Sequence, residues 1–457
     1  MAGQGRHQTL PQRTVGRRSL VLGGVAAAGT AVLAGGGSSL AAPAPARRAS
    51  SAARAAQDVT EIEFWHGFAA HEIAALQDML DQRFAPTHPT IKVNAVGGAD
   101  AAKILAAISG GNPPDVVLLP SPDAIGTWAH NGALQPLDDH IKTAGVDLGA
   151  FVPTGLEQCK LGEAYFALPF VNFNRALYWN KDLFKAAGLD PEVPPKTIDE
   201  MLSFAEKLTK KDGDSIAQIG VLPSLSLDEM AWRFGGDWYD AAGGKVSADS
   251  PANRKALQFE LDLANKVGGV DAVKRFQASQ ATGGGAADNP FYQGKIAMML
   301  EGCWQVAFID KYANGLNYGV TPVPAPPDVP DGATVNRLMT NPIGLPTGAK
   351  HLPEGWELLR FLATDVETSR EFAKVIANIP QLTAAFTDFT DDPRLKVFVD
   401  LSAAKGARAF PVLPITAQYT DAIATLETSV LTGETELGPG FEQLQSDMQT
   451  ELDKATK

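Results

Sequence analysis

The chain has 457 residues, more than a single hydrophobic core ordinarily supports, so two lobes are expected. Hydrophobic residues make up 45% of the sequence and charged residues 20%, which leaves enough apolar material for a globular body. The net charge of -13 argues against nucleic-acid binding and against a basic membrane-binding patch, because both need a surplus of Lys and Arg.

The first 46 residues have the pattern of an export signal. Arg17 and Arg18 precede an apolar run of small residues at 20–33, and a stretch rich in Gly, Ser, Ala and Pro follows. The run is too short and too rich in Gly and Ala for a membrane span. The Arg pair favours the twin-arginine route, with the general secretory route as the alternative. No Cys precedes Cys159, so no lipobox cysteine is seen, and we expect an exported, extracellular or cell-envelope protein.

After the signal, strand and helix patterns alternate. Strands are expected at 60–65, 91–96 and 115–119, and helices at 73–84, 99–109 and from 121 toward 128. This alternation predicts a parallel α/β sheet, in which ligands bind beyond the carboxyl ends of the strands. Two such ends supply candidate binding residues: Trp65, His66 and Gly67 after the first strand, and Ser121 and Asp123 after the third.

The stretch 164–184 is expected to cross from one lobe to the other. It reads as two strands rich in aromatic residues, and it contains Pro169, which favours extended backbone in the residue before it. Asn180 then caps a helix. We expect the ligand to lie against this crossover, where Asn172 and Asn174 are candidates for binding hydroxyl groups.

The rest of the chain continues the mixture of helices and strands. Thr197 and Glu200 form a capping box at the start of a helix. Further strands are expected at 216–222, 296–300, 317–323 and 337–343, and further helices at 252–266, 356–362, 367–376, 419–431 and 441–454. The predicted lobe one comprises 58–167 and 304–352, and the predicted lobe two comprises 168–303 and 353–457.

Motifs for catalysis and metal binding are absent from the mature sequence. His71 and Glu72 begin a string like HExxH, but residue 75 is Ala, so the zinc motif fails. No cofactor and no metal site are therefore predicted. Paired carboxylates for glycoside hydrolysis come together only in the fold, so an exported carbohydrate-active enzyme remains an alternative. Cys159 and Cys303 are the only cysteines, and they are either two buried thiols or one disulfide.

Several Trp residues lie at the ends of predicted elements, beside Gly or polar residues. They are Trp65, Trp232, Trp238 and Trp304. An aromatic face packs against the C–H face of a sugar ring, and nearby amides and carboxylates bind its hydroxyl groups. Trp232 and Trp304 are favoured for this role, and Gly302 and Asn341 complete the candidate site. The alternative for each is a place in the core or in the cap of a turn.

Seven short segments carry a resemblance to a known family. They are 64–67 (FWHG), 88–93 (HPTIKV), 111–117 (GNPPDVV), 131–137 (NGALQPL), 177–184 (LYWNKDLF), 291–304 (FYQGKIAMMLEGCW) and 319–324 (GVTPVP). In this order and spacing they resemble the carbohydrate-binding solute-binding proteins of ABC importers, the family that includes maltose-binding protein. The resemblance covers essentially the whole mature chain.

The resemblance implies a type II periplasmic-binding-protein-like α/β fold with two lobes and a hinge of several crossing segments. It implies a monomer that captures a sugar or oligosaccharide between the lobes, delivers it to the ABC permease membrane subunits and catalyses no reaction. Tyr419 lies where the family offers an aromatic ring to the ligand.

A glycerol-3-phosphate or glycerophosphodiester ligand is the alternative within the same class. The sequence departs from the glycerol-phosphate binders at 378–380, which lacks their Gly-Tyr-x-Pro pattern. The candidate site in the first lobe also contains no Arg, which disfavours an anion. The cations that would hold one are Arg175, Arg233, Arg337 and Arg408.

Overall fold

The computed structural model describes residues 59–68, 71–119, 121–223, 225–280, 288–329, 331–389 and 391–457. Contacts divide the chain into residues 1–56 and 57–457, and the description below concerns the second unit. The predicted export signal at 1–46 lies outside the described residues. Within the described part, none of the helices combines the length and the apolar character needed to cross a bilayer.

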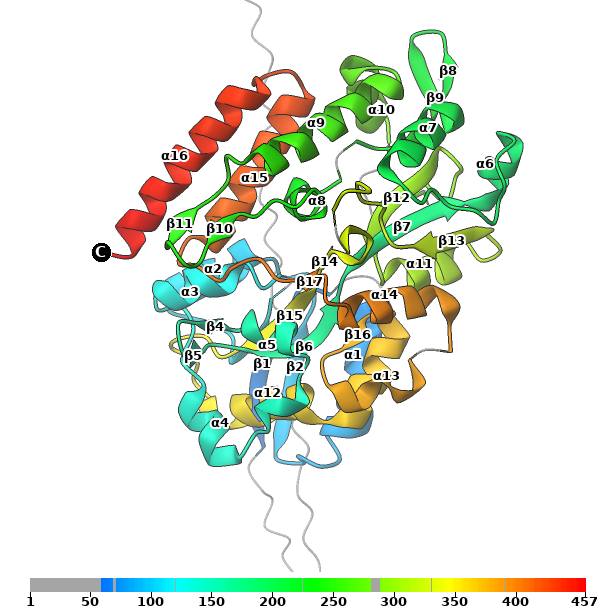
Figure 1. The fold of residues 1–457 in the computed structure, drawn as a ribbon. Helices are drawn as coiled ribbons and strands as arrows, with labels where there is room; N and C mark the ends of the chain where they lie inside the picture. Colours follow the sequence, from blue (N-terminus) through cyan, green and yellow to red (C-terminus); the bar gives the residue numbers. More distant parts are fainter. Residues whose placement is uncertain are drawn as a thin grey trace, which may run out of the picture. The chain divides into compact units, whose positions relative to one another are not determined.

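The first sheet has six strands in the order β16-β6-β15-β3-β1-β2 (Figure 1). They are β1 (Thr60–His66), β2 (Ile91–Val96), β3 (Val116–Leu118), β6 (Leu168–Phe173), β15 (Met339–Gly344) and β16 (Ile379–Pro380). β1 pairs in parallel with β2 and β3, which confirms the parallel arrangement predicted for this part of the chain. β15 runs antiparallel to both β3 and β6.

Helices cover this sheet and bury its apolar side chains. They are α1 (His71–Met79) with the π-helical turn η1 (Leu80–Phe84), α2 (Ala101–Ser109), α3 (Ala124–His130), α4 (Asp138–Ala144), α5 (Pro153–Glu157), α12 (Leu352–Thr364) and α13 (Val366–Ile376). In β1, Ile62 and Phe64 are buried whereas Glu61 and Glu63 are exposed, as the alternation predicts. All six residues of β6 are buried, because this strand lies inside the sheet with both faces covered.

The second sheet has five strands in the order β13-β7-β12-β9-β8. They are β7 (Arg175–Asn180), β8 (Lys210–Asp212), β9 (Ser215–Val221), β12 (Ile296–Gly302) and β13 (Tyr318–Thr321). Its helices are α6 (Lys181–Ala186), α7 (Ile198–Leu208), α8 (Leu227–Arg233), α9 (Pro251–Lys266), α10 (Val270–Ala278), α11 (Gln305–Tyr312), α14 (Pro393–Ala403), α15 (Thr416–Leu431) and α16 (Leu437–Ala455). Figure 1 shows α9, α15 and α16 side by side.

Short elements complete the fold. Three two-stranded ladders are β4 (Lys160–Leu161) with β5 (Ala164–Tyr165), β10 (Tyr239–Asp240) with β11 (Lys245–Val246), and β14 (Asn336–Arg337) with β17 (Ala407–Arg408). The 3-10 turns are η2 (Leu148–Ala150), η3 (Gly332–Thr334) and η4 (Thr383–Asp388). The predicted cap of α7 is confirmed, because Thr197 Oγ1 accepts a hydrogen bond from the Glu200 N–H at 3.1 Å.

The predicted crossover is confirmed, because β6 belongs to the first sheet and β7 to the second (Figure 1). The lobe boundaries stay a prediction, but three strands bear on them. β6 and β16, assigned to lobe two, pair within the first sheet, and β13, assigned to lobe one, pairs within the second. We therefore propose to assign each segment to the lobe whose sheet it joins.

Asn174, the single residue between β6 and β7, is fully buried and ties the crossing segments together. Its Nδ2 donates hydrogen bonds to Asn336 Oδ1 at 3.2 Å and to the Phe398 carbonyl at 3.0 Å. Asn336 Nδ2 in turn donates to the Leu401 carbonyl at 2.8 Å. Two buried amides thus join the crossover to β14 and to α14.

We expect Asn174→Ala to lower the free energy of unfolding by about 2 kcal/mol, because it leaves a buried amide oxygen and a buried carbonyl without their donor. Urea denaturation measures this change. The matched control is Asn317→Ala, which removes an exposed amide that binds Asp182 at 2.8 Å, and it should change stability little. Equal effects of the two substitutions would contradict a tying role for Asn174.

Glu260 of α9 and Glu427 of α15 form a buried carboxyl pair, with 0% and 4% of their surfaces exposed. Burial, followed by the Glu427 carboxylate, raises the pKa of Glu260 well above its ordinary value. The folded state therefore holds this proton more tightly than the unfolded chain does. Stability contributed by the proton is present at acid pH and is lost as the pH rises above the ordinary Glu pKa.

Glu260→Gln should remove that loss, because an amide has no proton to release. Relative to the variant, we expect the wild type to lose stability between pH 5 and pH 8, by up to about 1.4 kcal/mol for each rise of one pH unit, measured by urea denaturation. The variant should lose less over the same range. An equal slope for both proteins would show that Glu260 does not hold a proton in the fold.

Candidate functional site

A pocket with a volume of about 490 Å³ opens where the crossover leaves the first sheet. Both sheets contribute to it, since Phe173 ends β6, Arg175 begins β7 and Asn341 lies on β15. The full lining is Phe68, Glu72, Ser121, Asp123, Phe173, Arg175, Trp304, Phe308, Arg337, Met339, Asn341 and Asn378. The ligand was expected against this crossover, and the structure supplies a pocket there.

Trp304 has a fixed orientation in this pocket. It directly precedes α11, and its ring folds back over Gly302, where an added Cβ would lie 2.1 Å from the indole Cζ3. Only Gly leaves room for that approach. The ring of Phe173 meets the indole edge to face, with centroids 5.4 Å apart. The half-buried indole is therefore held in place before any ligand arrives.

Two further aromatic rings extend the apolar part of the lining. Phe68 follows β1 and packs against Phe372 of α13 at 5.5 Å between centroids. Phe308 lies on α11 one turn after Trp304, and His71 packs edge on against it at 4.9 Å. The pocket therefore combines aromatic rings from segments far apart in the sequence with amide and charged groups.

Arg337 is the most enclosed cation of the lining, with 8% of its side chain exposed. Its Nη2 donates to Asp123 Oδ1 and its Nη1 donates to Asp228 Oδ2, so one guanidinium binds two carboxylates. Burial lowers the pKa of Arg337, but the two carboxylates outweigh burial and raise it, which keeps the group charged.

Arg175 is the second cation, and its Nη1 donates to Ser226 Oγ at 2.5 Å. Nearby, burial raises the pKa of Glu301, while the Gly302 N–H and the Arg175 charge oppose that change. With Glu72 and Asp123 the lining carries as many acidic as basic side chains. No group of three His, Cys, Asp or Glu side chains within the described residues is arranged to hold a metal ion.

Four of the predicted site residues line the pocket: Ser121, Asp123, Trp304 and Asn341. Ser121 Oγ accepts a hydrogen bond from the Asp123 N–H at 3.3 Å, and Asn341 Nδ2 donates to the Leu119 carbonyl at 3.3 Å. These side chains come from the ends of β3 and β12 and from β15. The rule that ligands bind beyond the carboxyl ends of strands therefore predicted part of the lining.

Four other candidates lie inside the lobes, away from the lining. Asn172 and Asn174 are fully buried, and Asn172 Nδ2 donates to the Pro380 carbonyl at 3.3 Å. Trp232 is 2% exposed and packs against Phe410. Tyr419 is fully buried, and its hydroxyl donates to the Trp238 carbonyl at 2.7 Å. Through these contacts the four side chains stabilise the fold and do not line the pocket.

The last four candidates do not line the pocket. Trp65 donates to Glu63 Oε2 at 3.1 Å, and Gly67 follows β1. Gly302 provides the room for the Trp304 ring. His66 is fully buried between Phe64 and Phe68, with no hydrogen-bond partner on either ring nitrogen in the described part of the chain.

Eight lining residues are not among the site residues predicted from the sequence: Phe68, Glu72, Phe173, Arg175, Phe308, Arg337, Met339 and Asn378. Two of them had a visible signal, because Phe173 and Arg175 flank Asn174 in the predicted crossover. The sequence predicts a first-lobe site without Arg and assigns Arg175 and Arg337 only to an anionic ligand, whereas both side chains line this pocket.

Cys159 and Cys303 are both free and fully buried, so two thiols rather than one disulfide are present. Burial raises the pKa of both thiols, and that of Cys303 reaches about 12. Both groups stay protonated and unreactive at neutral pH. Cys303 contacts the pocket indirectly, because its Sγ lies 3.7 Å from Oδ1 of the lining residue Asn378.

Comparisons with known proteins agree with this architecture. The family model of bacterial extracellular solute-binding proteins matches residues 69–368. An uncharacterized ABC transporter extracellular-binding protein of Pyrococcus horikoshii is 27% identical over 379 residues, which cover 79% of this chain and 80% of that one. The sn-glycerol-3-phosphate-binding periplasmic protein UgpB of Shigella dysenteriae is 31% identical over 291 residues, covering 60% of this chain and 64% of that one.

Solved structures share the fold. The structure of CpMnBP1 with mannotriose bound has 28% sequence identity and a TM-score of 0.77, and the match covers 84% of this chain and 99% of that one. The GacH receptor of Streptomyces glaucescens, at 23% identity and a TM-score of 0.71, matches over 86% and 98%. The chain thus belongs to the bacterial extracellular solute-binding proteins, with their two-lobe type II α/β fold, and is a substrate-binding protein of an ABC transporter.

Proposed function

We propose that the protein captures an uncharged sugar or oligosaccharide in the pocket beside Trp304 and delivers it unaltered to the membrane subunits of an ABC permease. The observation that carries this proposal is the half-buried indole, fixed by Gly302 and Phe173 within a pocket that also presents amides and carboxylates. An aromatic face packs on the C–H face of a sugar ring, and polar groups around it bind the hydroxyl groups.

The proposed binding set is the lining of the pocket, with Ser121, Asp123, Trp304 and Asn341 as the members predicted from the sequence. The other predicted residues act in this proposal by supporting the lining. We further propose that the protein works as an exported monomer, that the signal at 1–46 uses the twin-arginine route, and that closure of the lobes about the hinge retains the ligand.

The relatives favour a saccharide. CpMnBP1 is described with mannotriose and with mannobiose bound, at 28% and 29% identity to this chain. Maltotriose-binding protein of Pyrococcus abyssi is 23% identical over 343 residues. Short mannose and glucose oligomers are therefore the first ligands to test.

Isothermal titration calorimetry against mannobiose, mannotriose, maltotriose and the corresponding monosaccharides tests the proposal. We expect saturable binding of at least one oligosaccharide with one site per chain. Chromatography of the recovered ligand should show it chemically unchanged. A shortened or rearranged saccharide would favour the alternative of an exported carbohydrate-active enzyme, and no binding across the panel would contradict a saccharide ligand.

Glycerol-3-phosphate is the second candidate ligand, because UgpB is a relative and because two Arg side chains line the pocket. Arg337 is already bound to two carboxylates, so a phosphate would have to be held mainly by Arg175, whose Nη1 donates to Ser226 Oγ. Titration with sn-glycerol-3-phosphate at low and high salt separates the candidates. Tight binding that weakens strongly with salt would favour the phosphate.

A further inference from the structure

We propose that Asp123 and Asp228 are specificity-determining residues that bind the Arg337 guanidinium from two sides and thereby exclude anionic solutes from the pocket. This inference rests on the proposed function for the location of the site. It goes further by assigning the choice between neutral and anionic ligands to a named cluster, which we call the carboxylate clamp: Asp123, Arg337 and Asp228.

The guanidinium of Arg337 already binds the two carboxylates of the carboxylate clamp. An Arg recognises a phosphate or carboxylate through paired N–H groups of its planar fork. In this structure Nη2 of Arg337 is taken by Asp123 and Nη1 by Asp228. The ring of Phe410 covers the guanidinium from one side, with its centroid 5.5 Å from Cζ. Nε of Arg337 is buried, and each Nη already binds a carboxylate, so an anionic ligand that approached either Nη would lie beside a negative charge.

The carboxylate clamp also carries a net negative charge. Glu229 Oε1 accepts a hydrogen bond from the Arg337 backbone N–H at 3.3 Å, but its charge is compensated by Arg233, whose Nη2 lies 2.6 Å away. Both members of that pair are buried. The carboxylate clamp therefore keeps two negative charges against one positive charge. Around the pocket, Glu72, Asp123 and Asp228 then outnumber Arg175 and Arg337 by one charge, so an anion that enters this partly desolvated place meets a net negative charge, where repulsion is weakly screened.

The two carboxylates of the carboxylate clamp come from different parts of the fold. Asp123 precedes α3, which packs on the first sheet, and Asp228 lies in the first turn of α8 beside the second sheet. Their side chains are 20% and 13% exposed; Asp123 lines the pocket, and Asp228 contributes through its bond to the lining residue Arg337. A single acid would neutralise Arg337. The second acid is not needed for neutrality, and it makes the site selective.

Substitution by Asn tests the carboxylate clamp, because Asn keeps the size of Asp and removes its charge. We compare the wild type, Asp123→Asn, Asp228→Asn and the double variant by calorimetry with sn-glycerol-3-phosphate and inorganic phosphate as anionic probes and mannotriose as the neutral probe. The wild type should bind the anions weakly or not at all. The double variant should gain at least tenfold in affinity for both anions, and the gain should shrink at high salt.

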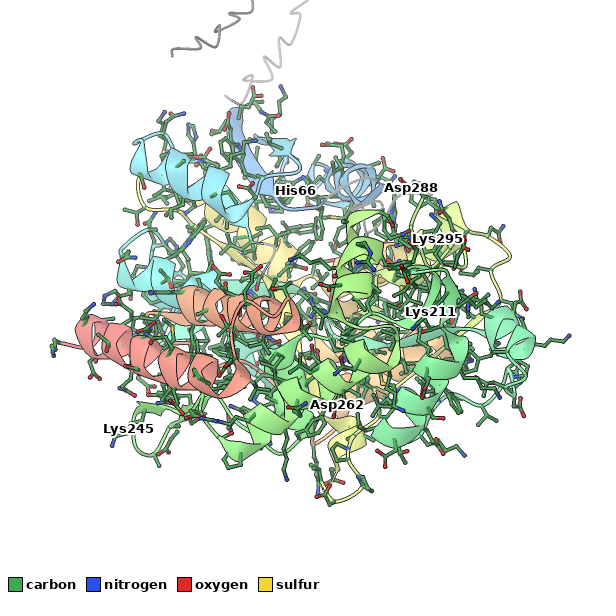
Figure 2. All side chains as sticks on the ribbon, turned by 90° about the horizontal axis from the view of Figure 1, so that it is seen from above. His66, Lys211, Lys245, Asp262, Asp288 and Lys295 are labelled. Atoms are coloured by element: carbon green, nitrogen blue, oxygen red, sulfur yellow. The ribbon has the colours of Figure 1, made fainter. Side chains whose placement is uncertain are left out.

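Control variants separate a gain in anion affinity at the carboxylate clamp from the effects of lost surface charge and of poor folding. Asp262→Asn removes an exposed charge on α9, whose side chain only accepts a hydrogen bond from Gln258, and it should leave anion affinity unchanged (Figure 2). Adding Arg337→Gln to the double variant should abolish the gained affinity. Each single variant is measured as well, so that poor folding of the double variant does not decide the test.

The anionic and neutral probes report on different claims. If neither the single nor the double variants gain anion affinity, or if the wild type already binds phosphate tightly, the carboxylate clamp does not exclude anions. Failure of the wild type to bind mannotriose or any other neutral saccharide speaks against the proposed function instead. A gain of anion affinity in the variants supports the carboxylate clamp in either case.

Discussion

Trp304→Ala should weaken saccharide binding by about a hundredfold, or about 3 kcal/mol, through loss of the stacking face and of its buried area. The indole is a candidate for so large an effect because its position is set in advance by Gly302 and by the edge-to-face contact with Phe173. Little conformational entropy is therefore lost when the ligand binds. Calorimetry with the tightest saccharide of the panel measures the change.

Two further variants make this result specific. Trp304→Phe keeps an aromatic face and should recover part of the lost affinity. Tyr312→Ala removes an aromatic side chain at the other end of the same helix, α11, outside the pocket lining, and it should leave affinity unchanged. Equal losses in Trp304→Ala and Tyr312→Ala would mean that the helix, rather than the indole face, matters for binding.

Acidification from pH 7 to pH 4 should lower the free energy of unfolding by about 3 kcal/mol through His66 alone. Burial lowers the pKa of His66 from 6.5 to about 4. Its ring lies between Phe64 and Phe68 at 5.5 and 5.8 Å between centroids, an apolar place that disfavours the charged form. The unfolded chain takes up the proton below pH 6.5 whereas the folded chain does not until pH 4, so stability falls across this window.

His66→Phe should remove most of this dependence, because Phe fills the same aromatic cluster and does not titrate. Urea denaturation of both proteins at pH 4, 5, 6 and 7 gives the comparison. His71 adds a smaller loss in the same direction, since burial and the charge of Lys311 lower its pKa, and this part remains in the variant. Equal pH dependence of the wild type and His66→Phe would show that His66 is not excluded from water, because the other titrating groups, Glu260 among them, are common to both proteins.

Local pattern predicted much of the fold. The alternation in β1 and the Thr197 cap depend on neighbours within a few residues, and both are found in the structure. The other half of the predicted capping box differs, because Glu200 Oε2 accepts a hydrogen bond from the Lys196 N–H at 2.7 Å rather than from the Thr197 N–H. The crossover was visible for the same reason, because Pro169 and the aromatic strands around it mark extended backbone. The order of late strands was not predictable in this way. β15 lies between β6 and β3 in the sheet although it is far from both in the sequence, and tertiary packing determines this strand order.

The pocket was only partly predictable, because similar local settings lead to different places. Trp232 and Trp304 both lie beside Gly and near the end of an element, yet Trp232 packs into the core and Trp304 lines the pocket. The direction of each ring follows from partners distant in sequence. Arg337 shows the same limit, because its two carboxylates lie 214 and 109 residues away. Its neutralisation is a property of the fold.

The most direct test of the account is a crystal structure of the protein with the tightest-binding saccharide of the panel. We predict one intact saccharide in the pocket between the two sheets, with a sugar ring packed about 4 Å from the face of Trp304. Its hydroxyl groups should bind side chains of that lining, and no anionic group should replace the carboxylates on Arg337. A saccharide bound elsewhere on the protein, or one present there in chemically altered form, would contradict the account.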